Sequence, residues 1–462
     1  MPSEQSVQHS LARLAHAVQF SDLPDAVVEG AKLLILDALG CTLGGFHSEP
    51  AAVVRALARD LGGTAEASFI GSPLLGSCAL AVFANGTALR YLDWNDYLFG
   101  RDPAHPSGNL PVALAIGERA GCSGREVIAA LVGAYEIHLR LAEYAGVPSL
   151  WKRGWHHSCN LAFSASALAA RLLGADAAVT AHAIAIAATH LNTLAQLQSG
   201  GISLIKATAE AWVAKGAVEA ALLAQHGLTG PDPIMEGKAG WAGSVAGGVD
   251  LAGLAAPLDG DFRMMRTSVK PYAAVATAMA PVQAAIDLHR DEGVRADSIA
   301  AVVVRLPEFA LGTPSADPDR RYPATRESAD HSFIYCTGVA LMFGRCMEPE
   351  FEDAVRTAPA LRDLLGRIEL AADAALTARW PGAAGGEVEV RLHDGRLLRR
   401  RYDAPPGHPT NMPDRAQAED KFLSLAAPVL GDARARQALE AVWSLDQADS
   451  IAPLMQRLTT PA

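Results

Sequence analysis

Lysines are the first side chains in this sequence that suggest chemistry, because the chain uses arginine for most of its other cations. Of its 39 cationic side chains only 7 are lysines. Lys206 stands early in an expected helix, where a cation gains nothing from the helix dipole but can share an anion with free backbone N–H groups. Lys270 follows in the segment VKPY. Both suit a role that needs a compact ammonium with an adjustable pKa.

Aspartates and histidines gather in two further segments. Asp93 and Asp96 stand three residues apart at the end of an apolar helix, and His105 follows in a loop framed by prolines. His156 and His157 come just before a helix of small residues, whose dipole should keep His156 neutral and suited to act as a base. The negative charge of the nearby aspartates should instead raise the pKa of His105 and suit it to act as an acid.

Several motifs typical of common enzyme classes are absent from the sequence. The sequence lacks GxGxxG after a strand, GxxxxGK[ST], HExxH and GxSxG, which disfavours nucleotide-binding, zincin and α/β-hydrolase functions. Ser203-Leu204-Ile205-Lys206 matches the SxxK pattern of serine acylases, but the later KTG partner of that pattern is absent. The 6 cysteines form no CxxC pair, so neither a zinc site nor an iron–sulfur cluster finds its usual ligand spacing. We therefore expect no metal.

Composition indicates a large folded protein. The chain has 462 residues, of which 50% are hydrophobic and 19% are charged, so it can bury a sizeable core. A net charge of -11 and the lack of a basic run argue against nucleic acid as a partner. The N-terminus does not resemble a secretory signal, which predicts a cytoplasmic protein. The most apolar stretch, residues 177–191, is too short and too polar to cross a membrane.

Periodicity divides the chain into two kinds of structure. Apolar residues recur at helical spacing in Ala-rich segments of the first 230 residues or so. After the Gly-rich stretch 237–254, a β-branched run at 299–305 and two alternating segments joined by Asp394-Gly395 predict strands and a hairpin. The last 50 or so residues return to a helical pattern. We predict a mostly α protein, with a helical domain formed by 1–267 together with 404–462 and a smaller α/β lid domain at 268–403.

The order of several motifs resembles the MmgE/PrpD family. These are DWND with HPSGN, GWH before an Ala-rich helix, ISLIKATAEAWVAKG, KPY, DHSFIY, and GHPTNMPDRAQAEDKF, and the resemblance runs from about residue 20 to 430. It implies a helical domain made of both chain ends, a smaller α/β lid, an active site between them, a homodimer, and catalysis without metal or organic cofactor. The catalytic residues it implies are Asp93, His105, His156, Lys206, Lys270 and Tyr335.

The resemblance also implies a substrate class. Members of the family include 2-methylcitrate dehydratases, cis-aconitate decarboxylases and an iminodisuccinate epimerase, so a small di- or tricarboxylate is expected. We expect it to be bound with the help of Asp96, His157, Tyr272 and Arg266. DHSFIY looks closest to the dehydratases. Tyr97, however, stands where the decarboxylase branch has threonine, and Ala273-Ala274 replaces the proline and cysteine that follow KPY in many members.

Dehydration of a hydroxypolycarboxylate explains these residue types. The reaction removes a weakly acidic proton beside a carboxylate and expels hydroxide, and cationic side chains can stabilise both developing charges. Lys206 and Lys270 would hold carboxylates, His105 or His156 would move the proton, Asp93 would orient a histidine, and Tyr335 would contact the substrate or leaving group. The same groups would serve a decarboxylase or an epimerase, and a silent helical protein that binds a ligand is the alternative from another class.

Overall fold

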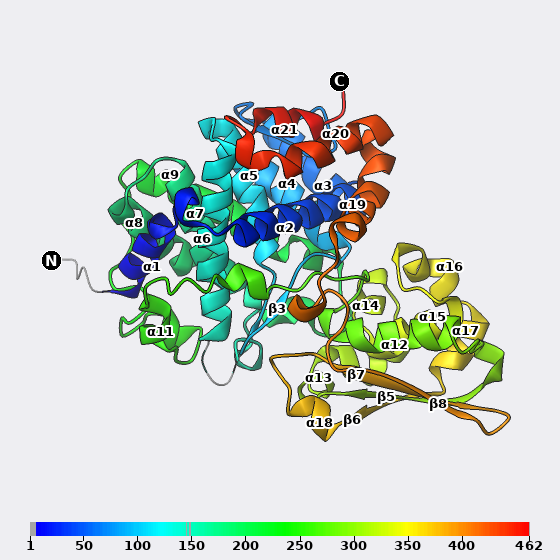
Figure 1. Cartoon of the computed structure of the whole chain (residues 1–462). Helices are drawn as coiled ribbons and strands as arrows, with labels where there is room; N and C mark the ends of the chain where they lie inside the picture. The colour runs from blue at the N-terminus through cyan, green and yellow to red at the C-terminus, as the bar shows by residue number, and fades with distance from the viewer. Residues whose placement is uncertain (1–5, 145, 147–148, 462) are drawn as a thin grey trace.

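A computed structural model describes residues 6–144, 146 and 149–461 of the chain. It confirms a mostly helical protein with a smaller α/β region (Figure 1). Helices from both ends of the sequence form one side of the molecule, and the only sheet of more than two strands in the described part lies on the other side. None of the described helices combines the length and apolar character that crossing a membrane requires.

The helical region is assembled from long Ala-rich helices and closed by the C-terminal ones. Small residues let the helix axes approach: a Cβ added at Gly40 of α2 would lie 3.3 Å from the Cα of Phe422 in α19, and one at Gly86 of α4 would lie 3.0 Å from the Cβ of Ala211 in α9. The helices are α1 Val7–Ala17, α2 Asp25–Gly44, α3 Glu49–Leu61, α4 Cys78–Tyr91, α5 Leu110–Ala120, α6 Gly124–Glu143, α7 Leu161–Leu172, α8 Ala177–His190, α9 Ala209–Gln225, α10 Trp241–Ser244, α11 Leu251–Ala255, α19 Arg415–Leu430, α20 Asp432–Trp443 and α21 Ala452–Arg457.

The α/β region contains a sheet with the strand order β6–β5–β7–β8, in which only β5 and β6 run parallel. The hairpin that Asp394-Gly395 predicts joins β7 to β8, and Gly395 adopts φ 89°, which favours glycine. The elements are α12 Met279–Arg290, β5 Ile299–Leu306, α13 Glu308–Leu311, α14 Arg326–Ala329, α15 Phe333–Phe343, α16 Asp353–Arg356, α17 Pro359–Leu365, β6 Ile368–Ala372, α18 Ala374–Thr377, β7 Gly386–Leu392 and β8 Leu397–Tyr402.

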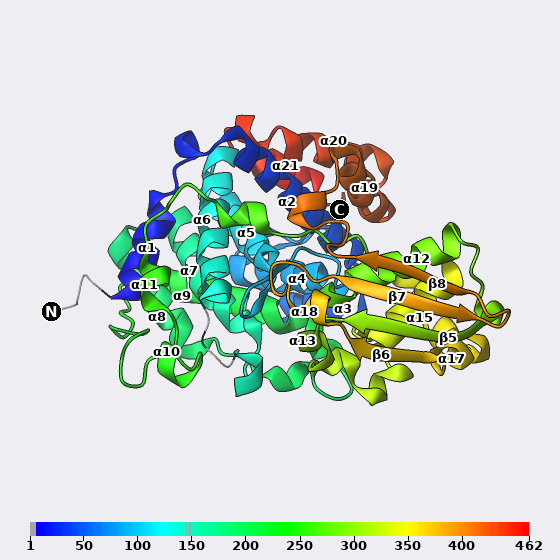
Figure 2. The same cartoon turned by 60° about the horizontal axis from the view of Figure 1, so that its bottom comes forward.

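One face of this sheet is covered and the other is open. Helices α12 and α15 pack together behind the sheet, as Figure 2 shows. Val302 and Val304 of β5 and Val388 of β7 are buried on the covered face. The residues between them form a charged outer face, where Arg305 pairs with Glu387 and Glu389 across the strands. This alternation is the period-two pattern seen in the sequence.

One short ribbon and two backbone pairings lie where the helical region meets the segment that carries Lys270. The strand β3, Leu98–Phe99, pairs with β4, Pro103–Ala104. Tyr97 pairs with Ser268, and the Val269 N–H donates to the Gly407 carbonyl at 2.8 Å. The segment that carries Lys270 is thereby attached to the helical region on one side and to the segment returning from the sheet on the other.

Candidate active site

A cavity of about 460 Å³ lies between the helical region and the α/β region. Its helical wall contains charged and imidazole side chains, and its opposite wall comes from α13, the segments on either side of it, and the start of the α/β region. The polar residues that line it and enter the argument below are Arg90, Asp93, His105, His157 and His331.

Asp93 is the centre of the charged wall. It follows α4 with φ 49°, the only positive φ at a non-glycine residue in the described part of the chain. Its Oδ1 accepts from Lys206 Nζ at 3.1 Å and from Arg90 at 3.2 Å, and its Oδ2 accepts from Lys270 Nζ at 2.6 Å. Burial alone would raise the pKa of Asp93, but the lysines and Arg90 hold it well below its usual range.

Lys270 is held in place by a third lysine. Lys421 Nζ donates to the Lys270 carbonyl at 3.1 Å and the Trp94 carbonyl at 2.8 Å, while its charge is paired with Asp37 at 2.6 Å. Lys421 therefore joins the backbones beside both Asp93 and Lys270 and positions this ion pair. Burial lowers the pKa of Lys270 to about 8, although Asp93 acts in the opposite direction. The ammonium is thus poised to give up a proton near neutral pH.

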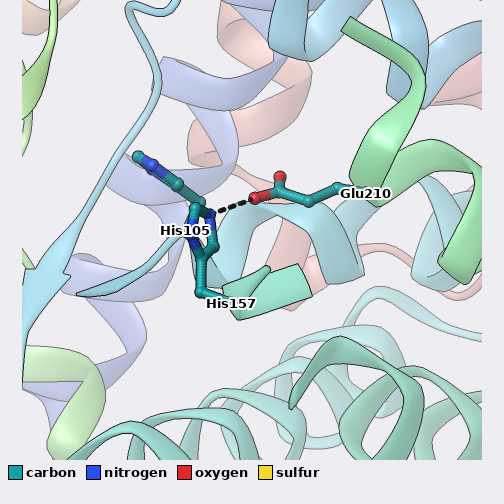
Figure 3. A group of neighbouring side chains, drawn as sticks. All are labelled: His105, His157 and Glu210. Atoms are coloured by element: carbon teal, nitrogen blue, oxygen red, sulfur yellow. Dashed lines mark ion pairs between the residues drawn. The ribbon is translucent and has the colours of Figure 1, made fainter. Parts of the chain in front are cut away.

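Arg90 links this wall to a second acidic group, Glu210 in the first turn of α9. Arg90 Nε lies 2.9 Å from Glu210 Oε2, and His157 Nε2 lies 3.4 Å from Glu210 Oε1. Figure 3 shows His157 and Glu210 facing each other beside His105. The close contact of α4 with α9 at Gly86 and Ala211 places Arg90 and Glu210 side by side.

His105, His157 and Glu210 each offer one ligand atom, and these atoms lie within 4.8 Å of one another (Figure 3). The spacing would admit a cation. The local charge disfavours a metal cation, because Glu210 is already paired with the buried guanidinium of Arg90. The histidines of this group are better suited to handling protons than to holding a metal.

The proton state of His105 differs from the one expected from the sequence. Its Nδ1 lies 2.6 Å from the Asp96 carbonyl oxygen, so Nδ1 carries the hydrogen and Nε2 keeps a free lone pair. Burial, followed by the charges of Arg90 and Lys270, holds the pKa of His105 well below its usual value. The expectation that nearby aspartates raise it was wrong, because burial and the cations outweigh Asp93. A neutral ring with its hydrogen on Nδ1 can accept a proton at Nε2.

The Asp96 carboxylate is hydrogen-bonded to groups other than the His105 ring it was expected to influence. It accepts from the Ser107 N–H at 3.1 Å and from the Tyr135 hydroxyl at 2.8 Å. Burial raises the pKa of Asp96 to about 7, despite the lowering effect of these hydrogen bonds. Asp96 therefore positions His105 through its backbone rather than through its charge.

His156 stands behind His157. Its Nδ1 accepts from the Ser158 N–H at 3.2 Å, and its ring lies 3.9 Å from that of His157. The pKa of His156 is well below its usual value, as the sequence predicted, but the cause is burial first and His157 next rather than the helix dipole. His156 is 1% exposed and does not line the cavity, whereas His157 does.

His331 is a cavity residue that the sequence analysis did not select, although it lies in DHSFIY. Its Nδ1 is paired with Asp330, and its Nε2 lies 4.0 Å from Asp93 Oδ2. Asp330 is in turn bound by Arg326 at 3.0 Å. The histidine closest to the Asp93 carboxylate is therefore this one.

Of the expected residues, Asp93, His105 and His157 line the cavity. Lys206 and Lys270 lie behind this lining and reach the cavity wall through their ion pairs with Asp93. Three other expected residues have partners elsewhere. The Tyr335 hydroxyl donates to the Glu350 carbonyl at 2.6 Å, because Tyr335 lies in the first turn of α15 on its packed side. The Tyr272 hydroxyl donates to Gln283, and Arg266 is paired with Glu143 and Asp261 near the surface.

Arg90 and Glu210 belong to the site but were not predicted from the sequence. Glu210 follows Lys206 by four residues, a spacing that puts both on one helix face and is the signal that was available.

The arrangement is suited to an anionic substrate. Arg90, Lys206 and Lys270 bring three cations to a buried wall where Asp93 and Glu210 are the facing carboxylates. The cations already bind one carboxylate, that of Asp93, so they can bind a substrate carboxylate in the same way. His105 Nε2 adds a free base to the same cavity. Proton abstraction beside a carboxylate is the chemistry this set of groups supports.

Two protein-family models together match most of the chain. Residues 9–253 match the MmgE/PrpD N-terminal domain, and residues 272–447 match the MmgE/PrpD C-terminal domain. The boundary between the two matches falls close to Lys270. Both walls of the cavity therefore lie in matched regions.

The names of similar proteins indicate two different activities, decarboxylation and dehydration. A protein named cis-aconitate decarboxylase from Homo sapiens is 24% identical over 479 aligned residues, which cover 99% of this chain and 95% of the relative. A protein of the same name from Aspergillus terreus is 24% identical, with 99% of this chain and 97% of the relative covered. A 2-methylcitrate dehydratase from Cupriavidus necator is 28% identical over 344 aligned residues, with 69% and 68% covered.

Proposed function

The chain belongs to the MmgE/PrpD family, and we propose that it is a lyase that dehydrates a small hydroxy-di- or tricarboxylate without a metal or organic cofactor. The observation that carries this proposal is the buried Asp93 carboxylate, bound by Lys206, Lys270 and Arg90 on the same wall as the free Nε2 of His105. The relatives named dehydratase and decarboxylase support an enzyme rather than a silent binding protein.

In the proposed reaction, Lys206 and Arg90 bind a substrate carboxylate and stabilise the negative charge that develops on it. His105 Nε2 takes the proton from the adjacent carbon, and the electron pair of that C–H bond moves toward the carboxylate. The pair then forms the C=C bond as the C–O bond breaks. Lys270, whose pKa burial lowers to about 8, donates a proton to the departing oxygen, which leaves as water.

Decarboxylation is the second candidate, and the names of the full-length relatives favour it. Loss of CO₂ leaves the same kind of carbanion, which the same cations would stabilise. The proton would then move in the opposite direction, from a protonated side chain to carbon. The neutral state of His105 suits proton removal better than proton delivery, so dehydration is our first choice.

Incubation of purified protein with candidate substrates tests the proposal. The panel is 2-methylcitrate, citrate, cis-aconitate and iminodisuccinate, followed by NMR in ²H₂O to detect alkene formation, CO₂ loss or deuterium exchange beside a carboxylate. We expect water loss from a hydroxypolycarboxylate, and no turnover by the double variant K206A/K270A. Absence of both turnover and exchange across hydroxypolycarboxylates would contradict the proposal, and CO₂ loss alone would favour decarboxylation.

We also propose that the protein is a homodimer. Val53, Leu57 and Leu61 of α3 are 60%, 41% and 64% exposed along one stripe of the helix, and Ile205, from a segment packed against α3, is 54% exposed. Such a contiguous apolar surface is typical of an interface. Light scattering should give twice the chain mass of 48.3 kDa, and L57E should lower it. A wild-type monomer at micromolar concentration would overturn this.

A further inference from the structure

Four aromatic rings form a continuous chain where the helical region meets the α/β region, and three of them line the cavity. Tyr97 and Phe99 have ring centroids 5.1 Å apart, Phe99 and Trp380 4.7 Å, and Trp380 and Phe309 4.3 Å with nearly parallel planes. Tyr97 and Phe99 belong to the helical region, whereas Phe309 and Trp380 belong to the α/β region. The chain of rings therefore spans the junction between the two.

Part of this aromatic surface faces the cavity without cover from the protein. Tyr97, Phe99 and Phe309 all line the cavity, and Phe309 remains 36% exposed despite its stack on Trp380. Val275 and Pro314 extend the same surface. When a ligand covers exposed aromatic rings inside a concave site, the buried apolar surface makes the free energy of binding more favourable.

A small hydroxypolycarboxylate cannot provide that cover. Nearly every carbon of such a molecule carries a carboxylate or a hydroxyl, and these groups are the ones that Arg90, Lys206 and Lys270 would bind. The cavity of about 460 Å³ lies within the range of roughly 300–1,000 Å³ that drug-sized ligands occupy. Space lined by aromatic rings thus remains beyond the charged wall.

We infer that the substrate carries an apolar substituent, an alkyl or aryl group of several carbon atoms, next to its carboxylates. The inference rests on the proposed function and narrows its substrate class. The carboxylates bind at the cationic wall, and the substituent lies against Phe99 and Phe309. In the alternative role, the four rings only hold the α/β region against the helical region, and ligand size is then irrelevant to affinity.

A series of substituted succinates tests this in the wild-type protein. Isothermal titration calorimetry would measure the dissociation constants of succinate, 2-methylsuccinate, 2-butylsuccinate and 2-benzylsuccinate, which share one dicarboxylate and differ in the apolar group. We expect affinity to rise about fourfold for each buried methylene, the ratio that about 0.8 kcal/mol gives. The 2-benzyl compound should bind more tightly than the 2-methyl compound.

Two variants then locate the substituent. F309A should weaken binding of 2-benzylsuccinate about tenfold while succinate changes less than about twofold. F343A is the matched control, because Phe343 is also on the α/β region, is 41% exposed, and is absent from the residues that line the cavity. It should leave the whole series unchanged. F99A serves as a second test should F309A fold poorly.

Each remaining result has a definite meaning. Equal affinities along the series would overturn the inference and leave the proposed function standing, as long as succinate itself binds or a small polycarboxylate is turned over. An equal loss for succinate and 2-benzylsuccinate in F309A would show the rings to be a contact between regions and would also overturn it. Failure of every member of the series to bind would overturn both the inference and the proposed carboxylate site.

Discussion

Lys270 Nζ donates twice to Asp93, at 2.6 Å to its Oδ2 and at 2.7 Å to its carbonyl oxygen. The two residues stand 177 positions apart in the chain, Asp93 within the first matched domain and Lys270 in the segment between the two matched domains. The double contact holds Asp93 at its positive φ of 49°, a conformation that costs free energy for a residue with a side chain. A substrate carboxylate must compete with Asp93 for Lys270, so binding and the position of this loop are coupled.

Removal of either lysine charge should reduce activity and preserve the fold. K206A and K270A each lose a charge-assisted contact in a buried site, and such a contact contributes about 1.5–3 kcal/mol, roughly ten- to over a hundredfold in kcat/KM. K215A is the control, since Lys215 pairs with the exposed Glu219 one turn along α9 instead of with Asp93. Steady-state kinetics together with circular dichroism would check this. Unchanged turnover in both K206A and K270A would remove these lysines from the site.

The alkaline limit of activity should belong to Lys270. Burial lowers the pKa of Lys270 to about 8, so its ammonium is present below that pH and is lost as the pH rises through it. We expect kcat/KM to fall above about pH 8 in the wild type. In K270R the guanidinium stays charged, so the fall should move to higher pH even where the maximum rate is reduced. A pH profile of kcat/KM for both proteins measures this, and identical alkaline limits would contradict the assignment.

Loss of the base at position 105 should affect chemistry more than binding. Glutamine in H105Q can still donate to the Asp96 carbonyl, but it cannot accept a proton, so kcat should fall by about two to four decades. Because burial holds the pKa of His105 well below its usual value, the wild type should keep this base active below pH 6.5. H190Q, a change at the exposed end of α8, is the matched control. Near-normal kcat in H105Q would exclude His105 as the base.

The sequence could predict the elements but not every side-chain direction. Helical periodicity and the Asp394-Gly395 turn predicted the helical region and the β7–β8 hairpin, because those features depend on local patterns. Lys206, Lys270 and Asp93 were also identified from the sequence, by residue type and by resemblance, and the structure brings them together.

The extent to which each site residue is buried could not be predicted from the sequence. The raised pKa expected for His105 assumed that charge within ten or so residues dominates, whereas desolvation by the whole fold prevails. Tyr335 and His331 lie in one motif, and only the start of α15 decides which of them faces the cavity. Arg90 meets Glu210 through the packing of α4 on α9, a contact between segments 120 residues apart in sequence that no local pattern reveals.

Chelation should leave activity intact. His105, His157 and Glu210 are spaced as metal ligands, but the Arg90 guanidinium, whose Nε lies 2.9 Å from Glu210, repels a cation at that position. Prolonged dialysis against EDTA, followed by activity assay and metal analysis, should give unchanged kcat and less than one metal per ten chains. Lost activity that one added metal restores would refute the cofactor-free mechanism.

Replacement of Asp96 by asparagine should change how stability depends on pH. Burial raises the pKa of Asp96 from 3.8 to about 7 in the folded protein, so the unfolded chain loses this proton first. Ionisation of Asp96 therefore destabilises the folded state as the pH rises from about 4 to about 7, by an amount on the order of a few kcal/mol. Asparagine carries no charge to desolvate, and it can keep the hydrogen bonds with Ser107 and Tyr135. D96N should thus gain thermal stability over the wild type between pH 4.5 and pH 7.5, as measured by Tm at each pH. D60N, at an exposed position on α3, sets the baseline, and a Tm difference for D96N that is constant across this range would show that Asp96 is ionised throughout.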